Sequence, residues 1–122
     1  MDTQKHVLWI SRHTMTAAQR ADLERALGGP VELLRWEETV EDVRALMPLI
    51  GRADAVAAVL PLDKLAELLW VAGNKPVLVA RSGRVPTGRT VLLPDGRQEK
   101  EFAFEHRGWW QLLAVNIRER RL

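Results

Sequence analysis

The chain has 122 residues, of which 47% are hydrophobic and 28% are charged, with a formal net charge of +2. This length and composition predict one domain with a substantial apolar core, and the longest apolar runs fall well short of the roughly 20 residues of a membrane span. The lack of cysteine excludes disulfides, thiolate metal sites and a cysteine nucleophile, and it fits a reducing, cytoplasmic setting. The first residues do not match the pattern of a secretory signal.

Charge is unevenly distributed between the two parts of the chain. Residues 1–74 carry a net charge of −3, and residues 75–122 carry a net charge of +5. A basic second part could attract phosphate groups. A mixed, solvated surface has the same composition, so charge alone leaves both interpretations open.

The first part of the chain alternates short apolar runs with helical patterns. His6–Ile10 is a compact apolar run that predicts a buried strand. Thr16 and Gln19 form a capping-box pattern, which predicts a helix that begins there and ends at Leu27, before Gly28. Val31–Trp36 predicts a second strand, nearer an edge of the sheet because polar residues interrupt it.

The same alternation continues over the next forty residues. Thr39 is expected to cap a second helix that Pro48 shortens or bends, and Ala55–Leu60 is the most strand-like segment. Leu62–Ala72 predicts a third helix, and Pro76–Ala80 predicts a fourth strand. Strands that alternate with helices in this way predict a parallel sheet with right-handed crossovers.

The end of the chain has a different pattern. Arg89–Leu93 and Glu101–His106 are expected to form strands around an Asp-Gly turn at positions 94–96. Gly108–Leu113 is expected to form a short helix, and Ala114–Arg120 a last strand. This end could extend the sheet in antiparallel fashion or serve in dimerisation.

The predicted fold class is therefore α/β: a Rossmann-like parallel sheet with helices on both faces and a C-terminal β-hairpin extension. We expect a single domain over residues 1–122, with a βα core in residues 1–85 and the extension in residues 86–122.

Two polar segments after predicted strands carry the groups that an anion site needs. In open parallel sheets ligands bind beyond the carboxyl ends of the strands. The loop after the first strand contains Ser11, Arg12, His13 and Thr14, and the segment after the fourth contains Arg81, Ser82 and Arg84. Both offer guanidinium groups and hydroxyls, and the first precedes a helix N-terminus. We expect the two segments to converge into one cationic pocket.

His13 is the histidine that a site in these loops would use, because imidazole exchanges protons near neutral pH. A capping or solvated loop histidine is the alternative, and it is the commoner case. Arg12, Arg81 and Arg84 could clamp phosphates or simply solvate the surface. Ser11 and Thr14 could cap turns. Neither segment matches a dinucleotide or Walker fingerprint, and the scattered histidines predict neither a metal site nor a cofactor.

The run from Trp9 to Thr16, followed by Gln19 and Leu23, resembles the opening of small CRISPR-associated ring nucleases. In that family a first strand runs into a polar His-Thr/Pro loop, then a Thr-x-x-Gln pattern and a helix. The resemblance covers mainly the first 30 residues. It implies a Rossmann-like homodimer that binds cyclic oligoadenylate and cuts it, which switches off type III CRISPR signalling. It implies neither a duplex nucleic acid nor a membrane as partner.

The resemblance also implies a reaction that needs no metal. A ribose 2′-hydroxyl attacks the adjacent phosphorus and leaves a 2′,3′-cyclic phosphate. His13 and Arg12 would be catalytic, with His13 moving a proton. Ser11, Thr14, Arg81, Ser82 and Arg84 would bind the ligand.

Two other functions fit the same residues. One is a binding module, a dimeric domain that senses or sequesters a nucleotide without cutting it. The other is phosphoryl transfer of the histidine-phosphatase kind, because Arg12-His13 at the end of a first strand resembles the Arg-His-Gly motif of those enzymes. In this chain Thr14 stands where that motif has glycine.

Overall fold

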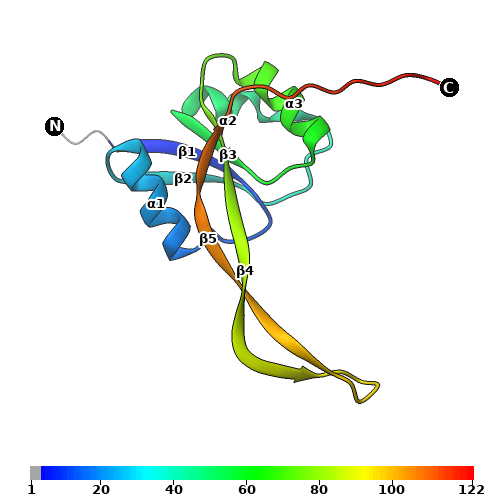
Figure 1. The fold of residues 1–122 in the computed structure, drawn as a ribbon. Helices are drawn as coiled ribbons and strands as arrows, with labels where there is room; N and C mark the ends of the chain where they lie inside the picture. Colours follow the sequence, from blue (N-terminus) through cyan, green and yellow to red (C-terminus); the bar gives the residue numbers. More distant parts are fainter. Residues whose placement is uncertain (1–3) are drawn as a thin grey trace.

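The computed structural model describes residues 4–122 and has an α/β architecture built on one five-stranded sheet. The strand order is β2-β1-β3-β4-β5; the first four strands are mutually parallel, and β5 pairs antiparallel with β4 (Figure 1). The predicted fold class is confirmed. The strands are β1 (Lys5–Ile10), β2 (Val31–Trp36), β3 (Ala55–Ala58), β4 (Val77–Leu92) and β5 (Gln98–Leu112), and the helices are α1 (Ala17–Leu27), the 3₁₀ helix η1 (Val43–Leu46), α2 (Met47–Arg52) and α3 (Leu62–Ala72).

Helix α1 covers one face of the sheet. The predicted capping box is present: Thr16 Oγ1 accepts from the backbone N–H of Gln19, and the Gln19 side chain accepts from the N–H of Thr16. Gly28 ends the helix in the left-handed conformation, with φ 84°. The buried Leu23 of α1 packs with alternate residues of the central strands, among them Trp9 and Ala57. This face of the core therefore contains the first strand's tryptophan.

Helices η1, α2 and α3 cover the other face. Alternate residues of the same strands point there, among them Leu8 and Val56, and pack with Leu46 and Leu68 of the helices. The short central strand β3 is buried at all four positions, as a parallel strand covered on both faces must be.

The hairpin of β4 and β5 extends far beyond the sheet as a two-stranded arm, which is plain in Figure 1. Strand β4 pairs with β3 only at Val77 and Leu78, and beyond them it pairs only with β5. The arm closes at the predicted turn, where Gly96 has φ 87° and donates its N–H to the Leu93 carbonyl. The hairpin thus begins inside the core, earlier than the expected boundary at residue 86.

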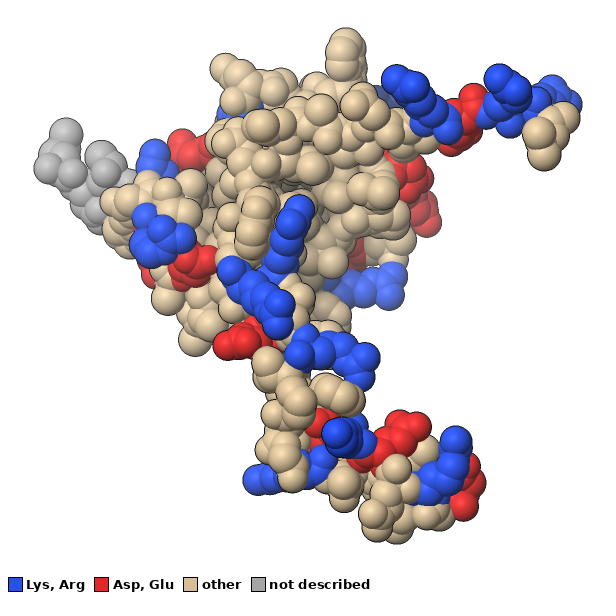
Figure 2. Space-filling view, viewed as in Figure 1, with Lys and Arg blue, Asp and Glu red and all other residues tan. Residues whose placement is uncertain are grey.

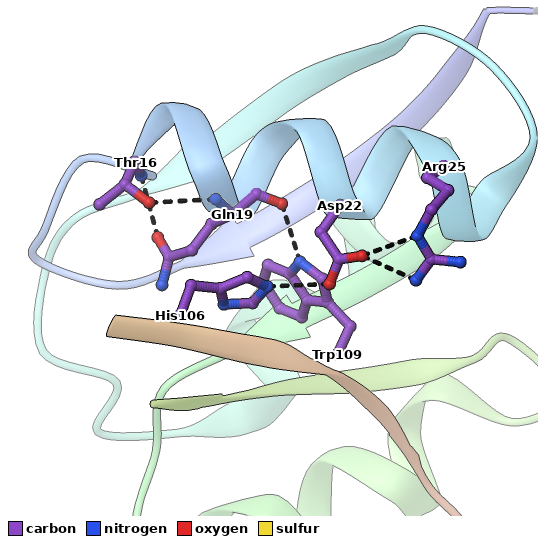
Figure 3. A network of polar contacts seen from close by, with 6 residues as sticks. All are labelled: Thr16, Gln19, Asp22, Arg25, His106 and Trp109. Atoms are coloured by element: carbon purple, nitrogen blue, oxygen red, sulfur yellow. Dashed lines mark hydrogen bonds and ion pairs between the residues drawn. The ribbon is translucent and has the colours of Figure 1, made fainter. Parts of the chain in front are cut away.

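Side-chain contacts with α1 hold the base of the arm. The indole Nε1 of Trp109 donates to the Gln19 carbonyl at 2.8 Å, and His106 Nε2 bonds Asp22 Oδ2 at 2.9 Å (Figure 3). The ring of Trp109 also meets Trp9 edge to face, with ring centroids 6.0 Å apart. Adjacent Trp109 and Trp110 point to opposite faces of β5, so Trp110 is 42% exposed.

Several predicted elements are wrong in type or extent. The second helix begins not at Thr39 but as η1, capped by Asp42, and continues as α2 with Pro48 in its first turn. Gly108–Leu113 is not a helix, because its residues to 112 belong to β5 and pair with β4. Ala114–Arg120 is not a strand and has no regular secondary structure. Within residues 4–122, no helix has the length and apolar character needed to cross a bilayer.

Candidate functional site

A cavity of about 400 Å³ lies at the carboxyl ends of β1 and β3. The loops that follow β1, β2 and β3 contribute to its wall, together with the first turn of α3. Its polar lining residues are Ser11, Arg12, His13, Glu38, Thr39 and Lys64. Its position is where ligands bind in open parallel sheets, and its size is within the range of small-molecule pockets.

The backbone of the loop after β1 is held firmly while its functional side chains stay accessible. Ser11 is buried, and its Oγ accepts the His13 N–H at 3.0 Å. The His13 carbonyl accepts from Trp9 Nε1 at 2.9 Å and from Arg35 Nη2 at 3.3 Å. Arg12 and His13 are exposed, so their charged or titratable ends can reach a ligand.

Cations from two elements flank the cavity. The Arg12 guanidinium bonds Thr39 Oγ1, which brings the loop after β1 to the loop after β2. Lys64, in the first turn of α3, bonds the Glu41 carbonyl at 2.9 Å. Glu38 supplies the opposing charge, so the pocket is mixed in sign with two cations against one carboxylate.

The helix end that favours an anion here is that of α3. Pro61 occupies its N-cap position, and no side chain caps its amide groups. Uncapped first-turn amides attract negative charge. In α1, which the sequence had suggested for this role, the Thr16 and Gln19 side chains already satisfy cap amides.

The segment after the predicted fourth strand is not a loop. Arg81, Ser82 and Arg84 lie within β4 and pair with Gly108, His106 and Phe104 of β5. The expected end of the strand at Ala80 is wrong because β5 continues the ladder beyond the sheet.

None of these three residues lines the cavity described above. The Arg81 guanidinium lies 4.6 Å from the Trp110 ring centroid, and that of Arg84 lies 4.2 Å from the Phe102 ring centroid. Thr14 is exposed and is likewise outside the lining. Of the seven predicted site residues, the structure therefore brings together Ser11, Arg12 and His13.

Three polar lining residues were missed by sequence reasoning: Glu38, Thr39 and Lys64. Each was visible as a polar residue just after a predicted strand, Glu38 and Thr39 after Val31–Trp36 and Lys64 after Ala55–Leu60. The sequence pattern predicts Thr39 as a helix cap. Lys64 lies inside an amphipathic helix pattern, where a lysine is ordinarily solvated.

Two other features of residues 4–122 bear on where a ligand or a metal could bind. A larger cavity of about 600 Å³ between η1 and α3 is lined by Glu41, Asp42 and Glu67 as well as by Arg44 and Lys64. It is away from the strand ends, and its carboxylates disfavour a phosphate. No group of three or more His, Asp or Glu residues suited to a metal occurs in residues 4–122.

His106 is engaged elsewhere. It bonds Asp22 on α1, and its side chain is only 9% exposed. The hydrogen bonds that Asp22 accepts from His106 and from Arg25 lower the pKa of the Asp22 carboxyl. His106 therefore does not contribute to the cavity beside His13. Comparisons of the chain with family models, with curated proteins and with solved structures found no match.

Proposed function

We propose that this protein binds cyclic oligoadenylate at the cavity beyond β1 and β3 and cuts it without a metal. The observation that carries the proposal is the convergence of Arg12, Lys64 and the uncapped N-terminus of α3 on one cavity beside an accessible His13. These are the groups that a phosphodiester needs: positive charge, amide donors and a proton carrier. The likeness of the first 30 residues to ring nucleases supplies the ligand class.

The chemistry is an internal transfer at phosphorus. The ribose 2′-oxygen forms a bond to the adjacent phosphorus while the bond from phosphorus to the 5′-oxygen breaks. His13 takes the proton of the 2′-hydroxyl and returns it to the departing 5′-oxygen. Arg12 and Lys64 stabilise the charge that builds on the phosphoryl oxygens. The products are a linear oligonucleotide with a 2′,3′-cyclic phosphate and a free 5′-hydroxyl.

A homodimer suits this ligand. A cavity of about 400 Å³ is at the small end of ligand pockets and accommodates one nucleotide unit better than a whole ring. Two copies related by a twofold axis would present the same cavity to opposite parts of the ring. In the cell, cutting the ring would end type III CRISPR signalling.

The test is chromatography of products after mixing the protein with cyclic tri-, tetra- and hexa-adenylate in the presence of EDTA. We expect linear products from at least one ring. His13→Ala should slow turnover by about 100-fold or more with little change in affinity, since it removes a proton carrier. His6→Ala, at the other end of β1 and bonded to Glu32, is the matched control and should leave turnover unchanged.

Arg12→Ala should mainly weaken binding and lower its dependence on salt, because one cation that meets phosphate is lost. Arg52→Ala, at the end of α2, is the matched control. Failure of the wild-type protein to bind any of the three rings would overturn the proposal.

The second candidate is a binding module that holds the same ligand uncut. One observation favours it: within residues 4–122 no hydrogen bond orients the imidazole of His13. General acid-base groups are ordinarily held in one orientation by a second residue. Tight binding with the ring recovered intact would establish this alternative.

A further inference from the structure

The outer edge of β5 has no partner strand. β5 lies at the end of the strand order, and beyond its base, which contacts α1 through His106 and Trp109, the arm that it forms with β4 stands away from the helices (Figure 1). A long free edge offers a row of backbone donors and acceptors to another strand. The arm also has little core of its own, and a two-stranded hairpin alone is at best marginally stable in water.

The two edges of the arm differ in their fitness for pairing. β4 contains Pro86, which lacks an N–H, and its register with β5 shifts between Pro86 and Thr90. Both features obstruct the addition of a strand to β4. β5 has no proline, and of the two register shifts in the ladder only the one between Arg81 and Ser82 leaves an extra residue, Arg107, on β5; the shift between Pro86 and Thr90 leaves its extra residues on β4. The free edge that can accept a strand is therefore that of β5.

Exposed aromatic side chains lie along this same strand. Phe104 is 79% exposed and Phe102 is 40% exposed, and they are the only two phenylalanines of the chain. Both point to one face of the arm, since they are two residues apart in a strand. A strand added beside β5 would cover them through cross-strand contacts.

The charges of β5 are complementary to those of a second β5 in one antiparallel register. When the twofold axis passes through Phe104, that residue faces its own copy, Glu101 faces Arg107, and Phe102 faces His106. No like charges then face each other between residues 101 and 107. An axis at Glu101 or Glu105 sets a carboxylate against itself, and an axis at Ala103 sets Glu101 against Glu105.

We propose that β5 pairs antiparallel with β5 of a second copy about an axis at Phe104, and that this continues the sheet across a homodimer. The inference goes beyond the proposed function, and its tests use no nucleotide. The arm suits a second copy better than a nucleic acid for two reasons. Its six cations and four carboxylates nearly balance, and both signs appear along it in Figure 2. Arg84 already covers the Phe102 ring, where a base would stack.

The assembly test is light scattering during size-exclusion chromatography. Wild-type protein should elute as a dimer, and Phe104→Glu should elute as a folded monomer, with dimer affinity reduced at least tenfold because two carboxylates would meet at the axis. Trp70→Glu is the matched control, since Trp70 is 88% exposed on α3, and it should stay dimeric. A wild-type monomer at every accessible concentration, or a dimer in Phe104→Glu, would overturn the proposal.

The register test uses the lack of native cysteine. In the proposed register residue 103 of one copy faces residue 105 of the other, at a Cβ distance near that of a disulfide. Ala103→Cys mixed with Glu105→Cys should therefore give, on mild oxidation, mainly the mixed disulfide, identified by mass. A predominance of Ala103→Cys linked to itself would place the axis at residue 103 and overturn the register.

A final measurement tests whether a nucleic acid, and not a second copy, binds to the arm. Fluorescence anisotropy with a labelled single-stranded oligoadenylate should show no binding that depends on Phe104. A monomer that binds the strand and loses it in Phe104→Glu would make the arm a nucleic-acid surface and overturn the inference. A monomer that still cuts the cyclic ligand would overturn this inference alone and leave the proposed function standing.

Discussion

At the scale of single residues, the loop after β1 combines a fixed backbone with a free side chain. Ser11 and Trp9 bond the amide and carbonyl of His13, while its imidazole stays exposed. His13, the proposed proton carrier, is thus positioned through its backbone. A ligand or a second copy is left to orient the ring itself.

Ser11→Ala tests how much this backbone support contributes. The substitution leaves the His13 N–H without its acceptor, and we expect the free energy of unfolding to fall by about 1 kcal/mol. Urea denaturation measures the change. Thr14→Ala, in the exposed part of the same loop, should lower the free energy of unfolding much less. An equal decrease in both variants would show that the hydrogen bond of Ser11 does not contribute specifically to stability.

Asp22 gives the fold a dependence on acid. Hydrogen bonds from His106 and then Arg25 hold the pKa of its carboxyl below the ordinary 3.8. A carboxyl whose pKa is lowered by folding stabilises the protein above its unfolded pKa, and the contribution is lost as pH falls through the folded value. Asp22→Asn should therefore be destabilising at neutral pH, and the gap to wild type should close below pH 3.8.

Denaturation midpoints measured from pH 3 to pH 7 would check this, with Asp95→Asn at the tip of the arm as the control. A gap that stayed constant across the range would mean that Asp22 acts through packing and not through its charge.

At the scale of elements, two glycines near the base of the arm differ in how well they should tolerate a side chain. Gly108 has φ 144°, and a Cβ there would come within 2.9 Å of the Trp110 ring. Gly83 does not have a positive φ, and the atoms nearest to a Cβ there would belong to the guanidinium of Arg107. A flexible side chain can move aside, whereas a backbone in a region reserved for glycine cannot.

Gly108→Ala should accordingly cost about 1–3 kcal/mol of stability, and Gly83→Ala should be nearly neutral. Thermal unfolding of the two variants gives a direct comparison, because both lie beside the same irregularity in the ladder. A larger loss in Gly83→Ala would mean that the packing of Arg107 across that position is essential.

The elements that the sequence predicts well are those whose signals are local. The Thr16–Gln19 capping box, the helix at Leu62–Ala72 and the turn before Gly96 each carry their own cues within a few residues. The buried core followed from the apolar runs that predict the strands.

The elements that failed depend on distant partners. Residues 81–84 have the glycine, serine and arginine of a loop, yet they are strand because residues 104–108 pair with them. The aromatic run near Trp109 suggested a helix for the same reason: the partner that makes it a strand lies almost thirty residues earlier. The candidate site could be predicted only in part. The sequence indicated Ser11, Arg12 and His13 of the first loop, whereas Lys64 could be assigned to the cavity only from the position of α3 beside that loop.

At the scale of the whole molecule, the protein has a well-covered sheet and a thinly covered arm. The central strands β1 and β3 are buried on both faces over most of their length. In contrast, most residues of the arm, from Arg81 to the turn and back along β5, are exposed. Local opening is expected where few apolar contacts hold a segment. The two regions should therefore differ in their exchange of backbone hydrogens.

Hydrogen-exchange mass spectrometry should find peptides from residues 87–101 exchanging much faster than peptides covering β1 and β3. If β5 pairs with a second copy, protection at residues 101–107 should rise with protein concentration, while protection of β1 should not change. Uniform protection along the arm in dilute protein would contradict the division drawn here.

The bonds of His106 and Trp109 to α1 have a consequence for any assembly built on the arm. A hairpin bonded to α1 at its base keeps the direction of its first residues fixed relative to the sheet. Two molecules joined through β5 would therefore keep one relative orientation of their sheets, and with it one arrangement of their two His13 cavities.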